Sequence, residues 1–348
     1  MGKIRRYEAK DFDQVVALYS QVYGDQTKRL EKLHKWLYEL NPAKDPKKFN
    51  GWVFEDGKIF GYVSGMPCLI KINNKNYRAV WSQNSVVHQQ FQGKGIGKKF
   101  FRQLFKDGDI FLALSMTKQV HSMLLKEGCL DICADYLATY NIVSKKTRLK
   151  QLLSSLKRRN MRLMINVFKK IFNEVKIINH SGISLIEIYN FNEKFDDLWK
   201  RASKSIPILT VKNRAYLNWR YIKSPTNYVI IAAEKLDLIK GYIVLDVSKN
   251  KYGTIVDFLV CPEDNQILKC LLLKAISIFK EKKLYNVKCI MPNDQRFSNV
   301  FHEIGFRKES KRILFVAKSC SENIPQTFLE NTSNWLITMG DSDVSTFF

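Results

Sequence analysis

Residues 87–99 read Val-His-Gln-Gln-Phe-Gln-Gly-Lys-Gly-Ile-Gly-Lys-Lys, with three alternating glycines at 93, 95 and 97. The apolar pattern of residues 77–87 predicts a strand before this stretch, and the aromatic residues of 100–105 predict a helix after it. Glycine allows a backbone to approach a ligand closely, and a helix N-terminus carries free N–H groups and partial positive charge. The stretch therefore predicts a strand, a loop and a helix that together bind a pyrophosphate group.

The glycine spacing identifies the kind of loop. It is Gly-x-Gly-x-Gly, which differs from the dinucleotide pattern Gly-x-Gly-x-x-Gly and lacks the Gly-Lys-Ser/Thr of nucleotide triphosphatases. It resembles instead the acetyl-coenzyme A signature Arg/Gln-x-x-Gly-x-Gly/Ala of the Gcn5-related N-acetyltransferases (the GNAT family). The resemblance implies that the strand backbone at Ser85, Val86 and Val87 pairs with the pantetheine amides of acetyl-CoA or another acyl-CoA. It also implies that the pyrophosphate is held by Gln92, Gly93, Lys94, Gly95, Ile96, Gly97 and Lys98.

The chain contains one pattern twice. Trp36-x-Tyr38-x-x-x-Pro42 recurs 183 residues later as Trp219-x-Tyr221-x-x-x-Pro225. In both halves an alternating apolar stretch ending in Gly-Tyr follows, and further landmarks come in the same order. We interpret this as a tandem duplication, similar to the tandem-domain acetyltransferases of bacteria and archaea.

Each copy is predicted to be an α+β (mixed α/β) domain with a mixed central sheet flanked by helices. In the first copy we expect a strand over 4–7, a helix around 15–22, a hairpin over 51–72, a helix over 95–105 and a strand over 110–116. The expected organisation is an N-terminal acetyltransferase domain with the acyl-CoA site (1–144), a basic amphipathic helical connector (145–180), a degenerate C-terminal acetyltransferase-like domain (181–318) and a tail (319–348).

The second copy lacks the glycine loop. Residues 260–269 contain no glycine, and Glu263 and Asp264 place carboxylates at the expected helix start, where they would repel a pyrophosphate. We therefore expect one acyl-CoA site per chain, in the N-terminal copy. Whether the second copy shapes the acceptor site or only supports the fold stays open at this point. The alternation of residues 335–343 predicts a closing strand, and its Asp341 and Asp343 are expected either in a solvated turn or facing a cationic acceptor.

Composition and charge exclude several classes of protein. The 348 residues carry 57 Lys+Arg against 33 Asp+Glu, a formal charge of +24, without an apolar run long enough to span a membrane. Seven cysteines without a Cys-x-x-Cys pair or clustered histidines argue against a disulfide framework and a metal site. We expect a cytoplasmic protein that does not bind nucleic acid. The cationic, amphipathic residues 145–176 predict either a helix packed on the two domains or peripheral contact with an anionic membrane at the inner surface.

Catalytic residues are not determined by the sequence. An amine acceptor is protonated at pH 7 and needs a base, yet the central strand holds no carboxylate, with Asn84 where related tandem proteins carry Asp. His88 at the strand end and His121 in a later helix are the other two candidates. The tyrosine that protonates the departing thiolate in the family is absent from both copies, where Leu124 and Phe301 occupy its position.

The function that this pattern favours is an acyl-CoA-dependent N-acyltransferase, with acetyl transfer to an amine of a small molecule or amino sugar. The amine would attack the thioester directly. Two alternatives remain from the sequence. One is a transferase that takes its acyl group from aminoacyl-tRNA, for which an acyl-CoA loop would be unnecessary. The other is a non-catalytic protein that binds acyl-CoA.

Overall fold

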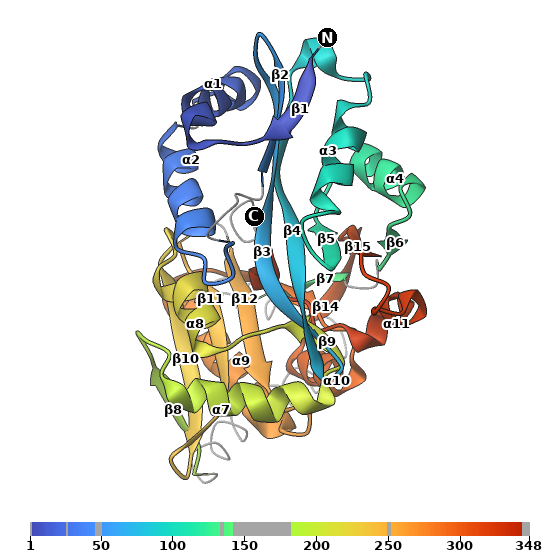
Figure 1. Cartoon of the computed structure of the whole chain (residues 1–348). Helices are drawn as coiled ribbons and strands as arrows, with labels where there is room; N and C mark the ends of the chain where they lie inside the picture. The colour runs from blue at the N-terminus through green and yellow to red at the C-terminus, as the bar shows by residue number, and fades with distance from the viewer. Residues whose placement is uncertain are drawn as a thin grey trace, which may run out of the picture.

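Two mixed β-sheets with helices on their faces form the computed structural model (Figure 1). The structure describes residues 2–25, 27–45, 51–132, 136–141, 182–248 and 252–342. The expected fold class is confirmed: both sheets contain antiparallel and parallel pairs, and helices cover them. The connector at 145–180, including the cationic residues 145–176, lies outside the described residues.

The first sheet carries the predicted strand, loop and helix. Its strands follow the order β1 (Lys3–Arg6), β2 (Gly51–Asp56), β3 (Lys58–Ile72), β4 (Lys75–Val87), β5 (Ile110–Leu114), β15 (Phe315–Ser319) and β6 (Leu130–Asp131), and β9 (Ile208–Thr210) also pairs with β3. Helices α1 (Phe12–Tyr23) and α2 (Thr27–His34) lie on one side of the strands, and α3 (Ile96–Leu104) and α4 (Lys118–Lys126) lie on the other (Figure 1). The hairpin, strands and helices expected for the first copy are therefore confirmed.

The second sheet has the order β14 (Arg307–Arg312), β7 (Tyr136–Asn141), β13 (Asn286–Met291), β12 (Gly253–Val260), β11 (Leu238–Asp246), β10 (Tyr228–Lys235) and β8 (Ser184–Glu187). Its helices are α7 (Glu193–Ala202), α8 (Arg214–Leu217), α9 (Asn265–Glu281), α10 (Gln295–Ile304) and α11 (Gln326–Glu330). Short helical turns are η1 (Ala9–Asp11), η2 (Lys35–Glu39), η3 (Gln89–Phe91), η4 (Ser203–Ser205), η5 (Asn218–Ile222), η6 (Thr332–Asn334) and η7 (Met339–Asp341).

The two sheets exchange strands. β7 comes from the first half of the chain but pairs with β13 and β14 in the second sheet. β15 comes from the second half but pairs with β5 and β6 in the first sheet. Each sheet therefore contains strands from both sides of residue 144, where the sequence suggests the end of the N-terminal domain.

The repeated landmarks occupy matching places in the two sheets. Gly61 pairs with Val87 across β3 and β4, and Gly241 pairs with Val260 across β11 and β12. A Cβ on Gly61 would lie 3.0 Å from the Phe100 ring of α3, so the glycine lets this helix approach the strand. The two Trp-x-Tyr motifs form the π-helical turns η2 and η5.

The C-terminal segment forms neither the predicted closing strand nor, at Asp341, a solvated turn, because the turn found there is buried. Instead of a closing strand over 335–343, the chain makes a single bridge from Trp335 to Ile208 and then the turn η7. Asp341 is buried in that turn, where its carboxylate accepts a hydrogen bond from the Thr338 N–H. This carboxylate therefore stabilises the turn and does not face solvent. Asp343 lies outside the described residues. Among the described helices, none is long and apolar enough to cross a membrane.

Candidate functional site

The central strands β4 and β5 diverge in the first sheet. They pair in parallel only from Ala79–Ile110 to Trp81–Leu112, although β4 continues to Val87. Val86 and Val87 bond to β3 on their other side. Residues 82–87 therefore present a strand edge that β5 does not cover, and the predicted pantetheine-pairing residues Ser85, Val86 and Val87 lie on it.

A bulge interrupts β4 in this part of the strand that β5 does not cover. The register with β3 shifts between Tyr62 and Ser64, and Asn84 adopts a left-handed backbone conformation with φ of 43°. Such a bulge bends a strand and reorients its backbone groups. Asn84 is half-buried here and Ser85 is exposed, and both lie where β4 extends beyond its pairing with β5.

The glycine loop leads from the end of β4 into α3. Gly93 and Gly95 have φ of 77° and 76°, a conformation that side chains disfavour, and a Cβ on either would meet open space. Gly95 is the N-cap of α3, and as a glycine it has no side chain that could accept a hydrogen bond from the first N–H groups of the helix. The first N–H groups of α3, at Ile96, Gly97 and Lys98, are left without helical partners, as at any helix start. Residues 92–95 are exposed, so a ligand can reach these groups.

Aromatic and apolar contacts hold the loop in place. The Phe91 ring packs against Phe54 and Phe60, with centroid distances of 5.0 and 4.7 Å. The Gln92 amide donates to the Val87 carbonyl at 3.1 Å. Helix α4 lies beside the start of α3: a Cβ built on Gly97 would be 3.9 Å from the Met123 sulfur.

The lysines of the loop differ in their surroundings. Lys98 forms an ion pair with Glu127 at 2.8 Å, and Arg102 contacts the same carboxylate at 2.5 Å. Hydrogen bonds from Arg102 and Lys98 lower the pKa of Glu127 to about 2. Lys94 lies 4.9 Å from the centroid of the Phe91 ring, a cation–π distance. Lys98 is thus partly neutralised, whereas Lys94 remains exposed beside the glycines.

The two histidine candidates have local roles. His88 is the N-cap of η3, where Nδ1 accepts from the Gln90 N–H at 3.4 Å, and its ring packs on Phe60. His121 lies on α4 with Nε2 3.4 Å from the Asp131 carboxylate on β6. The structure therefore places Asn84 on the part of β4 that β5 does not cover, His88 directly after the end of β4, and His121 beside β6 with a carboxylate partner.

The comparisons with known proteins agree with this geometry. The family model described as an acetyltransferase (GNAT) domain matches residues 3–109, which contain β4, the glycine loop and α3. This region is a GNAT acetyltransferase domain. The expected enzyme class, an N-acyltransferase, is confirmed with it. None of the curated proteins matched the chain.

Solved structures share the GNAT fold over both halves of the chain. A probable N-acyltransferase from Enterococcus faecalis aligns with a TM-score of 0.62 at 9% identity, covering 92% of this chain and 73% of the other. A GCN5-related N-acetyltransferase from Anabaena variabilis gives 0.60 at 11% identity, with coverage of 92% and 73%. The N-myristoyltransferase of Saccharomyces cerevisiae with bound myristoyl-CoA gives 0.56 at 11% identity, with coverage of 91% and 79%. At these identities the likeness shows the fold.

A series of hydrogen bonds beside the bulge of the GNAT domain was not predicted from the sequence. The Tyr38 hydroxyl lies 2.5 Å from the Ser64 hydroxyl, which donates to the Gln83 carbonyl at 3.4 Å. Tyr38 belongs to the repeated Trp-x-Tyr motif. In the second copy the motif tyrosine, Tyr221, donates to Asp257 on β12 at 2.7 Å. Tyr38 therefore reaches β4 through Ser64 of β3, whereas Tyr221 contacts β12 directly. The shared Trp-x-Tyr spacing was the signal in the sequence that could have pointed to both tyrosines.

The corresponding part of the second copy is closely packed, whereas Asn84 is half-buried and Ser85 is exposed on β4. All eight residues of β12 are buried. Asp257, which lies as far from the strand end as Asn84 does in β4, pairs with the buried Lys212 at 2.5 Å. The turn η7 packs here so closely that a Cβ on Gly340 would lie 2.2 Å from the Tyr221 hydroxyl. The described part of this site has no room for a pantetheine chain.

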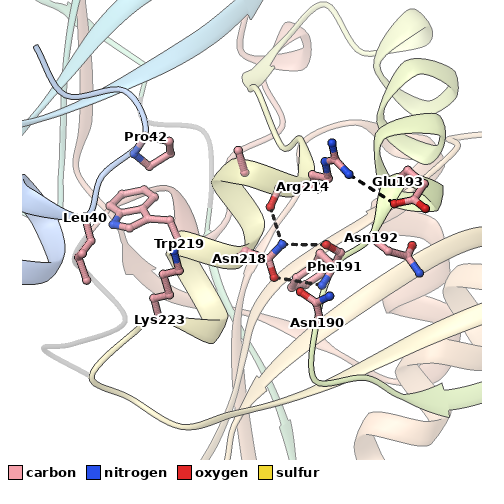
Figure 2. A pocket seen from close by; sticks show the side chains of 11 residues that line it. Leu40, Pro42, Asn190, Phe191, Asn192, Glu193, Arg214, Asn218, Trp219 and Lys223 are labelled. Carbon is pink, nitrogen blue, oxygen red and sulfur yellow. Dashed lines mark hydrogen bonds and ion pairs between the residues drawn. The ribbon is translucent and has the colours of Figure 1, made fainter.

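A pocket of about 490 Å³ lies where the two halves meet (Figure 2). Its polar groups bind one another: the Asn218 amide donates to the carbonyls of Phe191 and Arg214, and the Arg214 guanidinium contacts Glu193 at 3.3 Å. None of the site residues expected from the sequence lines it. We assign no ligand to this pocket.

Proposed function

We propose that this protein is an acyl-CoA-dependent N-acyltransferase that transfers an acetyl group to the amine of a small molecule or amino sugar. One observation carries the proposal: the edge of β4 beyond its pairing with β5 leads directly, through glycines with positive φ, into the N-terminus of α3, whose N-cap is a glycine. A strand edge pairs with amides, and a helix start with exposed N–H groups binds phosphates. The two sites in succession match a pantetheine joined to a pyrophosphate.

The residues of the GNAT domain then have distinct tasks. Ser85, Val86 and Val87 offer backbone groups to the pantetheine, and residues 92–98 offer N–H groups and lysine charge to the pyrophosphate. Bound acyl-CoA supplies an activated thioester carbonyl, which the acceptor amine attacks. A thiol with a pKa near 8.5 is a tolerable leaving group, so the absence of the family tyrosine is compatible with transfer. Asn84 and His88 are the candidates beside the reacting groups.

The role proposed for the second copy is to complete the fold of the first. Its β15 continues the GNAT sheet beyond β5, and its own opening is filled by Lys212, Asp257 and η7. A single acyl-CoA site per chain follows. The aminoacyl-tRNA alternative does not require the glycine loop, and the loop is present with open space around it.

Calorimetry with acetyl-CoA and thiol release with a panel of amines and amino sugars test the proposal together. We expect one site per chain and thiol release that depends on the amine. Two equivalent sites would contradict the assignment of the second copy. Binding without release for every amine would favour the non-catalytic alternative, and no binding of any acyl-CoA would favour the aminoacyl-tRNA alternative.

We further propose a cytoplasmic location with peripheral contact to anionic membranes through residues 145–176. The support is the sequence alone, because these residues lie outside the described part of the chain. Co-sedimentation with neutral and anionic vesicles at low and high salt tests it. Association with anionic vesicles that salt abolishes, and that is lost when Lys157, Arg158, Arg159 and Arg162 are neutralised, is the expected result. Equal recovery in the supernatant with both vesicle types at low salt would leave only a packing role.

A further inference from the structure

The point at which β4 and β5 diverge is closed by aromatic side chains on the face toward the second sheet. Trp81 is the last β4 residue that pairs with β5, and its ring stacks on Phe315 with centroids 5.8 Å apart and an interplanar angle of 24°. Phe315 in turn meets Trp335 edge to face at 5.2 Å. The indole N–H of Trp335 donates to the Leu329 carbonyl at 2.8 Å, which fixes its orientation. We call these three side chains the aromatic wall: Trp81, Phe315 and Trp335. Their exposed fractions are 0%, 1% and 1%.

The opposite face of the same point is packed as well. Toward α3 and α4 the neighbouring side chains are Val80 on β4, Phe111 and Ala113 on β5, and Val316 on β15, all of them buried. A side chain that bordered a cavity wide enough for an alkyl chain would show exposed surface in that cavity. These side chains show almost none, so in the described part of the chain neither face contains a channel beyond Trp81.

The direction of the bound donor follows from the proposed function. A pyrophosphate at residues 92–98 fixes one end, and a pantetheine paired with Ser85–Val87 continues along β4 toward residue 82. The thioester then lies near the bulge at Asn84, and its acyl group points to the place where β4 and β5 converge. The first side chains that a lengthening acyl chain would meet are those of the aromatic wall.

We propose that the aromatic wall limits the donor to short acyl chains, of about the size of acetyl or propionyl, an inference that rests on the proposed function. The fold itself does not impose this limit on the acyl chain, because the yeast N-myristoyltransferase, which has a similar fold, holds the long-chain donor myristoyl-CoA. Side chains must set the length, and close packing leaves no volume into which a longer chain could extend. Phe315 and Trp335 belong to the C-terminal half, so that half contributes directly to donor selection in the N-terminal site.

Calorimetry with coenzyme A, acetyl-CoA and octanoyl-CoA tests the inference on the full chain. For the unaltered protein we expect octanoyl-CoA to bind at least tenfold more weakly than acetyl-CoA. Phe315→Ala removes the middle ring of the wall and should bring the two affinities within about threefold, by opening a cavity that the octanoyl chain can fill. Phe315→Leu, which preserves more of the packing, should shift the ratio in the same direction by a smaller factor and serves if Phe315→Ala does not fold.

Phe301→Leu is the matched control. Phe301 is as buried as Phe315 but lies on α10, against Phe258 and Phe306 of the second copy, so its replacement should leave the ratio unchanged. Equal binding of octanoyl-CoA and acetyl-CoA to the unaltered protein would overturn the inference while leaving the proposed function intact. An unchanged ratio in both folded Phe315 variants would also overturn it. Failure of coenzyme A and both acyl-CoA molecules to bind would overturn the proposed function and this inference together.

Discussion

Trp36 and Trp219 lie stacked, with ring centroids 5.5 Å apart, and each indole N–H donates to the backbone carbonyl of the other. The two donor–acceptor distances are 2.8 Å and 2.7 Å. A reciprocal pair of this kind arises where two equal elements meet across a two-fold axis, as in symmetric dimers. The turns η2 and η5 therefore relate the two halves of one chain as subunits are related in a homodimer.

Trp36→Phe should destabilise the protein by about 1–3 kcal/mol, because it removes one donor and leaves the buried Trp219 carbonyl unpaired. Trp219→Phe should have a similar effect, since the pair is symmetric. The double variant should lose less than the sum of the two, because both changes affect one contact. Urea unfolding measures all three. Trp199→Phe, on the partly exposed side of α7, should change the stability little, and simple additivity in the double variant would contradict a shared contact.

Gly95→Val should weaken acetyl-CoA binding by well over tenfold. The position needs a φ of 76°, which costs a residue with a Cβ roughly 1–2 kcal/mol, and the new side chain would stand where the ligand must approach. Calorimetry measures the affinity. Gly57→Val is the matched control, since Gly57 has a φ of 75° and open space around it in the turn between β2 and β3. Equal losses of affinity in the two variants would show that strain, and not the approach to the ligand, is responsible.

Glu127→Gln should strengthen acetyl-CoA binding about two- to fivefold at low salt, because it frees Lys98 and Arg102 beside the start of α3. The gain should disappear at high salt. Glu303→Gln breaks the pair with Lys269 at the matching place between α9 and α10 of the second copy and should leave the affinity unchanged. If Glu127→Gln bound acetyl-CoA more weakly at low salt, the ion pairs of Glu127 with Lys98 and Arg102 would instead be needed to hold the start of α3 in its binding conformation.

The same carboxylate sets a pH dependence. Its pKa is lowered to about 2 from 4.5, so the ion pairs stabilise the fold fully above pH 4.5 and lose this contribution as the pH falls toward 2. The difference in stability between the unaltered protein and Glu127→Gln should therefore shrink over that range.

Asp257→Asn should destabilise the protein by about 3–5 kcal/mol, because it leaves the ammonium group of Lys212 buried with only the more distant Asp341 as a counter-charge. Adding Lys212→Met should restore most of the loss, since no buried cation then remains. Thermal unfolding measures both variants. If Asp257→Asn alone were as stable as the original protein, Asp341 would be sufficient to neutralise the buried Lys212 ammonium group.

The local structure of the first copy could be predicted because each element has its own periodicity. The expected strand and helix around the glycine loop lie within two residues of β4 and α3. The partners of β7 and β15 could not be predicted, since a short strand carries no sign of which sheet it joins and the exchange depends on contacts far apart in the chain. The aromatic wall could not be predicted for the same reason, because its members Trp81 and Phe315 are more than two hundred residues apart in the chain.

The pair of Lys212 and Asp257 shows a different limit. Asp257 occupies the place in its copy that Asn84 occupies in the GNAT domain, and the repeat made that correspondence visible in the sequence. Lys212 has no counterpart in the repeated pattern, so its role as the buried counter-ion required the structure.

The exchange of β7 and β15 governs the order in which a newly synthesised chain can fold. The ribosome releases β5 long before β15, so the growing chain carries the GNAT sheet with β5 at an unpaired edge until residue 319 has emerged. Unpaired edges of this kind template aggregation. Completion of the GNAT sheet during translation must therefore wait for β15, and a stop codon anywhere before β15 would leave both halves incomplete, including the half in which we propose the donor site.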